Sequence, residues 1–235
     1  MFESKAVPSS VIKRKTEERL ALIESTTGRK PGKKERKEIS EDVKSSLLPM
    51  AFSKRGEVLV WIDRGAGLLV IDASSQGRAD EAITALVRAI DGLGVLQINT
   101  NLSPATAMAN WLTTREPPAG SSIDRECELK ACDESKSVVK YARHALDVDE
   151  VRQHIAEGKL PTKLALTWEG RVSFVLTESL QVKKLVFLDG VFDGTSQEKE
   201  DGFDADAAIS TGELRRVLPD LLAALGGEMV LGQAA

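Results

Sequence analysis

The residues of this 235-residue chain whose types could support catalysis or metal binding are few and widely spaced. Its two cysteines, Cys127 and Cys132, have C-x4-C spacing with no second pair, whereas a structural zinc site is usually announced by two such pairs. Its two histidines, His144 and His154, are accompanied by no G-x-S-x-G or H-E-x-x-H signature. We therefore expect ordinary thiols, no metal site and no catalysis by either histidine.

Two carboxylates placed two residues apart, Asp204 and Asp206, are candidates for holding Mg²⁺. On a strand they would share one face, and together with Glu213 they could serve a nuclease. Alternatively, they begin a helix, whose positively polarised end acidic residues complement. We favour the helix, because no further cluster of acids and lysines accompanies the pair. Residues 28–34 also lack the phosphate-loop pattern. The sequence predicts neither an enzyme nor a cofactor.

A run of basic residues is the strongest signal in the sequence. Residues 1–55 carry a net charge of +6 and residues 56–235 a net charge of −10. Clustered cations can contact phosphates and release counterions, which gives affinity for nucleic acid without base readout. A solvated helix face, partly neutralised by glutamates, would give the same pattern. No aromatic residue accompanies the run, so we expect contact with the backbone rather than base stacking. The cations are Lys13, Arg14, Lys15, Arg19, Arg29, Lys30, Lys33, Lys34, Arg36 and Lys37.

These cations fall on two predicted helices, at residues 9–26 and 33–48, and on the short loop rich in Gly and Pro that joins them, which carries Arg29 and Lys30. Such a connection makes an antiparallel helical hairpin. Ile39, Val43 and Leu47 recur at i, i+4 and i+8 on one face of the second helix. This apolar stripe is narrow, so we expect it to pack against another surface or a second copy of the chain.

The rest of the chain mixes strands and helices joined mostly by hairpin-like connections. This pattern indicates an α+β fold with largely antiparallel sheet regions and a protruding helical hairpin. We expect two domains, a basic hairpin at 1–55 for dimerisation and DNA contact and an α+β body at 56–235. The predicted strands are 57–63, 68–73, 95–98, 123–130, 138–144, 164–168, 172–177 and 182–188, and the predicted helices include 79–90, 108–112, 148–157 and 211–225. Residues 189–202 are predicted as a loop, and 203–210 as a strand or transition.

The composition also bounds where the protein works. No stretch approaches the ~18–20 uncharged apolar residues that cross a bilayer, so we expect no membrane association. Residues 1–8 lack the apolar segment of a signal peptide. Two cysteines cannot form a disulfide framework that stabilises a chain of this length. The low cysteine content therefore favours a reducing cytoplasm as the location.

Several short blocks occur together and in a fixed order between about Pro8 and Glu228. The blocks are LLPMAFS at 47–53, WID at 61–63, IDRECEL at 123–129, HIAEGK at 154–159, TKLALTW at 162–168, FDAD at 203–206, TGEL at 211–214 and LGGE at 225–228. In this combination the chain resembles the RdgC family of recombination-associated proteins. The blocks cover most of the chain, and jointly they are far more specific than any one alone.

The resemblance implies a cytoplasmic, nucleoid-associated DNA-binding protein without catalysis. It implies a homodimer that closes as a ring around double-stranded DNA, with single-stranded DNA as a further form, and that inhibits RecA-promoted recombination. Phe52 would lie beside the contact between two copies, while Arg29, Lys30 and Lys163 match basic positions of the family. Two departures matter: Met50 stands where the family has Arg, and family members carry a further N-terminal segment, so we expect a shortened member.

The expected sites combine the basic run, the apolar stripe and the resemblance. We expect DNA contacts at Lys13, Arg14, Arg29, Lys30, Lys33, Lys34, Lys37 and Lys163, and dimer contacts at Ile39, Val43, Leu47 and Phe52. An alternative function is that of a truncated regulator, a protein-interaction module that pairs with full-length relatives and has lost DNA encirclement. Binding of DNA by this chain alone distinguishes the two.

Overall fold

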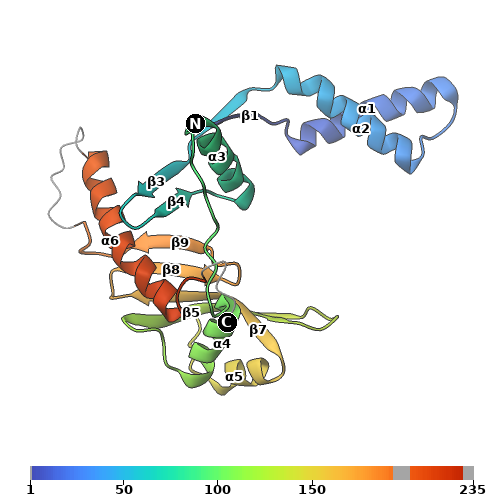
Figure 1. The fold of residues 1–235 in the computed structure, drawn as a ribbon. Coiled ribbons are helices and arrows are strands. Elements are labelled where there is room, and N and C mark those ends of the chain that lie inside the picture. Colours follow the sequence, from blue (N-terminus) through green and yellow to red (C-terminus); the bar gives the residue numbers. More distant parts are fainter. Residues whose placement is uncertain (1, 193–201, 230–235) are drawn as a thin grey trace. The chain divides into compact units, whose positions relative to one another are not determined.

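The computed structural model describes residues 2–192 and 202–229, and the chain divides into two compact units, residues 1–95 and 96–235 (Figure 1). The boundary expected after residue 55 falls inside the first unit. Both units combine helices with antiparallel strands, so the predicted α+β class is confirmed. Among the described residues, no helix is long and apolar enough to cross a membrane.

The first unit contains a helical hairpin, α1 and α2, and a β-hairpin followed by a helix. Strand β1 pairs antiparallel with β2, and β3 pairs antiparallel with β4. The elements in chain order are β1 (Phe2–Lys5), α1 (Ser9–Thr27), α2 (Lys33–Leu47), the 3-10 helix η1 (Leu48–Met50), β2 (Ser53–Gly56), β3 (Leu59–Asp63), β4 (Leu68–Asp72) and α3 (Gln76–Ala89).

The helical hairpin forms where the sequence predicts it, and a short ladder ties its ends together. Helix α1 ends at Gly28, whose φ of 67° is the left-handed conformation that glycine adopts readily at a helix end. Helix α2 starts directly after Gly32, and the two helices contact each other. Strands β1 and β2 flank the hairpin, so their pairing fixes its base. These strands escape sequence analysis because four-residue segments such as SKRG show no apolar alternation.

The second unit is built on a five-stranded antiparallel sheet with the strand order β6-β5-β7-β8-β9. The predicted three-strand meander is confirmed as β7, β8 and β9, which run from the centre of the sheet to one edge. The elements are α4 (Pro104–Thr114), β5 (Ser121–Ala131), β6 (Val138–Ala142), α5 (Asp149–Ala156), β7 (Lys159–Trp168), β8 (Val172–Thr177), β9 (Val182–Phe187) and α6 (Gly202–Ala224).

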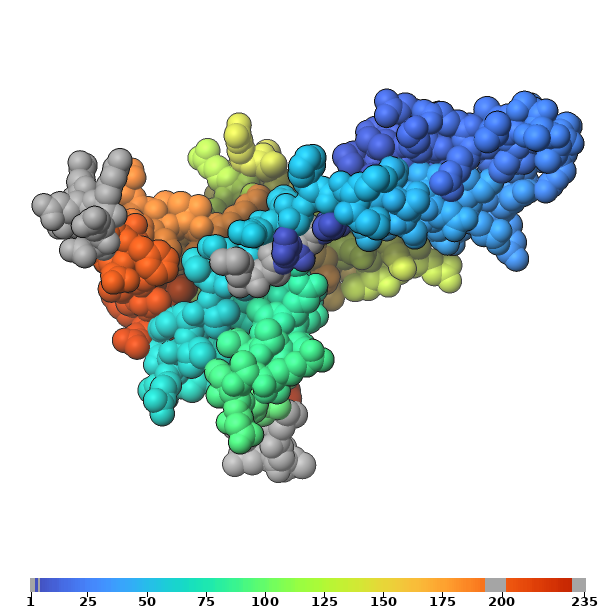
Figure 2. Space-filling view, turned by 90° about the horizontal axis from the view of Figure 1, so that it is seen from above, coloured from blue at the N-terminus to red at the C-terminus, as the bar shows by residue number. Residues whose placement is uncertain are grey.

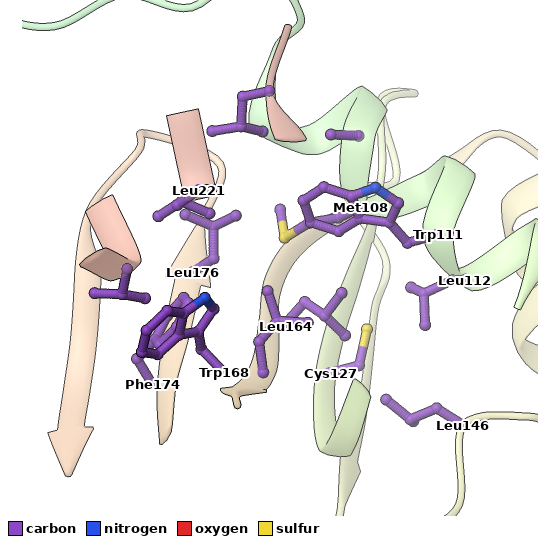
Figure 3. Close-up of a cluster of buried hydrophobic side chains, with 14 of the residues drawn as sticks. Met108, Trp111, Leu112, Cys127, Leu146, Leu164, Trp168, Phe174, Leu176 and Leu221 are labelled. Atoms are coloured by element: carbon purple, nitrogen blue, oxygen red, sulfur yellow. The ribbon is translucent and has the colours of Figure 1, made fainter. Parts of the chain in front are cut away.

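One face of this sheet carries the core, where side chains from the strands and from α4, α5 and α6 form a single buried cluster (Figure 3). Leu164 and Met108 are fully buried in it. Trp168 is also buried, and its indole Nε1 donates a hydrogen bond to Oδ2 of Asp220 on α6 over 2.9 Å. Because successive strand residues point to opposite faces, the residues between these core positions lie on the other face of the sheet.

The structure differs from the predicted elements at two segments. Residues 203–210, predicted as a strand or transition, belong to α6, as the helix start favoured for Asp204 and Asp206 implies; the alanines of this segment favour a helix over the short alternation. Residues 95–98 form no strand; they lie where the two units divide, and Leu96 is largely exposed. A short apolar run with no partner strand does not build a ladder. Most of the loop predicted at 189–202 lies outside the described residues.

Candidate nucleic-acid interface

The hairpin cations fall into two groups that differ in their acidic neighbours. Four of the predicted DNA-contacting residues lie beside a glutamate and have side chains that are 64–80% exposed. Ion pairs this exposed contribute about 0–1 kcal/mol, so an approaching phosphate can displace the glutamate at little cost. The pairs are Arg14–Glu18 at 3.8 Å, Arg29–Glu35 at 3.0 Å, Lys30–Glu24 at 3.5 Å and Lys37–Glu41 at 3.8 Å.

The other group has no ion-pair partner within the described residues. It comprises Lys13 on α1 and Lys33 and Lys34 on α2, and all three are exposed. A cation without an acidic neighbour gives up only water and counterions when it meets a phosphate. These three lysines are therefore the most available phosphate contacts among the predicted residues.

Helix α2 separates its charges onto different sides. Lys33, Lys37 and Lys44 recur at i, i+4 and i+11, which places them along one side of the helix together with Ser40. We call Lys33, Lys37 and Lys44 the lysine stripe. Three of the acids, Glu35, Glu38 and Asp42, recur at i, i+3 and i+7 and lie along another side. The fourth, Glu41, lies beside the stripe, 3.8 Å from Nζ of Lys37. The helix therefore presents a mainly basic side, with Glu41 as the acid beside it.

An open groove of about 420 Å³ lies between the helices on the side of the lysine stripe, since Ser40 lines it. Figure 2 shows the two helices of the hairpin side by side in blue. The groove has a partly apolar floor, with cations of both helices along it and Glu17 as an acid among them. It is lined by Ser9, Ile12, Lys13, Thr16, Glu17 and Leu20 of α1 and by Arg36 and Ser40 of α2.

Two basic residues of this side are missing from the predicted site. Arg36 lines the groove, and its Nε donates a hydrogen bond to the carbonyl oxygen of Pro31 over 3.2 Å, which orients the guanidinium near the loop. Lys44 completes the lysine stripe one turn beyond Ser40. The helical spacing from Lys33 was the signal that could have found it.

The residues predicted as dimer contacts have very different exposures. Val43 is 1% exposed, so the hairpin itself already covers it. Ile39 and Leu47 are half-buried. Phe52 is 97% exposed, and nearby Met50 is 73% exposed, although apolar side chains of this size are usually covered. Their role in a dimer stays a prediction, in which Phe52 offers the largest surface still to be buried.

Lys163 lies in the second unit, on β7, and is held by an acid. Its Nζ donates a hydrogen bond to Oε2 of Glu128 over 3.0 Å, and Lys140 on β6 approaches the same oxygen at 3.1 Å. The hydrogen bond from Lys163, with those from Thr162 and Lys140, lowers the pKa of Glu128 to about 2. Unlike Lys13, Lys33 and Lys34, Lys163 therefore has a strong internal competitor for any phosphate.

The remaining sequence candidates are scattered. Cys127 is buried in the core, and burial raises the pKa of its thiol to about 12, while Cys132 is exposed. His144 contacts the carbonyl oxygen of Ala145, and His154 lies 3.1 Å from Nζ of Lys159. Within residues 2–192 and 202–229, no three His, Cys, Asp or Glu side chains come together as metal ligands would.

The acidic pair lies on a helix rather than on a strand. Asp204 is in the first turn of α6, as the interpretation of these acids as a helix start predicts. Asp206 follows two residues later and points to a different side, because residues two apart do not share a helix face. Glu213, the third acid of the nuclease alternative, instead receives a hydrogen bond from Nε of Arg171 over 3.0 Å.

Together, the fold and the hairpin define an α+β protein with a basic, exposed helical surface suited to contact with phosphates. The family model described as "Putative exonuclease, RdgC" matches residues 1–228. The chain is 46% identical over 230 residues to the recombination-associated protein RdgC of Janthinobacterium sp. (strain Marseille), covering 97% of this chain and 77% of that relative. It is 44% identical to the protein of the same name from Dechloromonas aromatica, with the same coverage. The chain belongs to the RdgC family.

The names of the relatives and of the family model point in different directions. The relatives are named recombination-associated proteins, which places the chain in a family connected with DNA recombination. The family model's description names an exonuclease. The arrangement of acids described above does not bring Asp204, Asp206 and Glu213 together on one face.

Proposed function

We propose that this chain is a non-catalytic DNA-binding protein that contacts the phosphate backbone of double-stranded DNA through its helical hairpin. The observation that carries the proposal is the uneven charge of α2, whose lysine stripe lies beside the groove residue Ser40 while three of its four acids lie on another side. Contacts to phosphate give affinity and orientation but carry no sequence information, so binding is largely independent of sequence. Single-stranded DNA offers the same phosphates and is the second form expected.

We further propose that the chain acts as a homodimer. The support is the exposed apolar segment that follows α2, above all Phe52 and Met50. A two-fold interface brings the same patch of each copy together, so one exposed phenylalanine supplies both halves of the contact. Two hairpins joined in this way bring two basic surfaces to one duplex, and the second attachment becomes intramolecular. Ring closure around DNA is the arrangement that the family resemblance implies.

The proposed role in recombination follows from occupancy of duplex DNA by this chain. A protein that covers duplex DNA without sequence preference withholds it from the recombinase, and this is how we propose that the chain inhibits RecA. The name of the relatives, recombination-associated protein, supports this setting. In the cell, such a protein would be cytoplasmic and associated with the nucleoid.

Salt-titrated binding to linear and to closed-circular duplex, with the mass of the protein measured in parallel, tests the proposal. We expect a dimer that binds both forms, and an association constant that falls with salt with a log–log slope of about −0.9 for each phosphate contacted. Stronger resistance to competitor DNA on the circle would support encirclement. Neither DNA form should be degraded in Mg²⁺.

Three results would contradict the proposal. A chain that binds no DNA at low salt but co-purifies with a full-length relative would select the alternative of a protein-interaction module. Salt-insensitive binding would exclude a backbone contact. Loss of nucleotides from DNA ends in Mg²⁺, abolished in Asp206→Ala, would select the nuclease named in the family description.

A further inference from the structure

The face of the second unit's sheet that lies opposite the core carries a closely bonded group of side chains around Glu128. Its neighbours Cys127 and Leu129 point into the core, so Glu128 points to the opposite face. In the ladder, Glu128 stands directly opposite Lys163 on β7 and Lys140 on β6. The three residues therefore form one cross-strand row, in which side chains of opposite charge meet.

The two oxygens of the Glu128 carboxylate have different partners. Oε2 receives both lysines, Lys163 at 3.0 Å and Lys140 at 3.1 Å. Oε1 accepts a hydrogen bond from the hydroxyl of Thr162 over 2.9 Å. Two ammonium groups and one hydroxyl converging on a single anion are the donors that also bind a phosphate group. The side chain of Glu128 is only 18% exposed, whereas that of Lys163 is 40% and that of Lys140 is 69% exposed.

We propose that Lys140, Thr162 and Lys163 form a phosphate-binding site that Glu128 occupies in the free protein, and that a backbone phosphate of bound DNA displaces it. This inference rests on the proposed DNA binding. A phosphodiester carries the same single negative charge as the carboxylate, so the exchange leaves the charge of the site unchanged. The hydroxyl of Thr162 can donate to a phosphate oxygen as it does to the carboxylate.

The covalent attachment of Glu128 decides which anions can enter. An anion tethered within the same chain has an effective concentration in the millimolar range or above, so dilute free phosphate competes poorly with it. A phosphate of DNA that the chain already holds through other contacts is itself tethered, and it competes on equal terms. Glu128 therefore keeps the site closed to small anions and reduces the affinity of the site for DNA.

Glu126, on the same strand and pointing to the same face, provides a contrast. Within residues 2–192 and 202–229 it pairs with Lys184 alone, through both oxygens at 2.6 and 2.7 Å. One lysine without a converging hydroxyl offers a phosphate fewer donors than the group around Glu128. The proposal is therefore specific to Glu128.

Replacing Glu128 with Gln in the full chain tests the proposal, because the amide keeps the shape of the side chain but removes its charge. We expect the affinity for duplex DNA to rise about 3- to 10-fold at low salt, with the salt slope steeper by about 0.9 for each lysine that gains a phosphate. The matched control is Glu134→Gln, which changes the same charge at an exposed residue with no ion-pair partner among the described residues. Lys163→Gln added to Glu128→Gln should reverse most of the gain.

The outcomes separate this inference from the proposed function. If wild type binds DNA but Glu128→Gln gains no more affinity than Glu134→Gln, Glu128 is only a structural partner of the lysines, and the inference is wrong. If wild type binds no DNA, the proposed function and this inference fail together. Should Glu128→Gln unfold the chain, Glu128→Asp carries the test, since its shorter side chain retracts the carboxylate; an affinity equal to that of wild type would then overturn the proposal.

Discussion

A set of lysines on the helical hairpin of the first unit and a set on the sheet of the second unit are held differently. On the hairpin, Lys13, Lys33 and Lys34 have no ion-pair partner within the described residues. On the sheet, Lys140, Lys163 and Lys184 each lie within 3.1 Å of a glutamate oxygen. A helix places side chains at three- and four-residue steps, so it can gather like charges on one side, whereas antiparallel strands bring residues of different strands face to face.

The same comparison applies to burial. The sheet packs a large cluster that includes Leu164, Leu166 and Leu176 with no exposure, whereas on α1 and α2 Val43 is the buried apolar side chain. Stability therefore resides mainly in the second unit, while the first presents an accessible charged surface. A binding surface of this kind does not need a large core, because its side chains contact the ligand from solvent-exposed positions.

The largest expected effect contrasts the two regions by the same substitution. Leu164→Ala removes a side chain with no exposure from the centre of the sheet and should lower the free energy of unfolding by about 2–5 kcal/mol. Leu22→Ala on α1, where the side chain is 67% exposed, should change it by less than about 0.5 kcal/mol. Chemical denaturation measures both; equal effects would contradict the division into a packed sheet and a solvated hairpin.

The next effect is the dependence of the free energy of unfolding on pH, through Glu128. The hydrogen bond from Lys163 is the main cause of the low pKa of Glu128, about 2 against a usual 4.5. Because the pKa is lower in the folded state, the stabilisation is complete above about pH 4.5 and is lost as the pH falls toward 2. The free energy of unfolding of wild type should exceed that of Glu128→Gln by about 1–3 kcal/mol at pH 6, and this difference should vanish by pH 2. A difference that is independent of pH would show that the charge of Glu128 is not what stabilises the fold.

A smaller effect distinguishes the two kinds of residue predicted at the dimer contact. Val43→Ala removes a buried side chain and should weaken the hairpin by about 1–2 kcal/mol, which faster amide hydrogen exchange in α1 and α2 would reveal.

The smallest effect on folding is expected at Phe52, which is 97% exposed. Phe52→Ala should leave the free energy of unfolding of the monomer within about 0.5 kcal/mol of wild type. In the proposed dimer it should nevertheless shift the mass toward the monomer, as analytical ultracentrifugation measures. An unchanged dimer would place the contact elsewhere.

Sequence reasoning succeeded where the pattern is local. The helical hairpin is predicted because Gly28 and Gly32 bound its loop and because Ile39, Val43 and Leu47 repeat with the helical period. Strands β1 and β2 could not be predicted, because their pairing depends on two segments about fifty residues apart that lack apolar alternation. Likewise, nothing in the sequence indicates that Glu128 faces Lys163, since that row depends on the register between strands.

Reversing two cations of the lysine stripe tests the central claim, that the hairpin binds the DNA backbone, most directly. The variant Lys33→Glu with Lys44→Glu is compared with Arg64→Glu with Arg88→Glu, a control of equal charge change at exposed residues of the same unit that have no ion-pair partner in the described chain. Binding to duplex DNA is titrated with salt. We predict that the stripe variant loses about 10- to 100-fold in affinity and about 1.8 in salt slope, while the control loses much less. Equal losses in the two variants would contradict the account, because DNA would then be sensing net charge rather than the groove side of the hairpin.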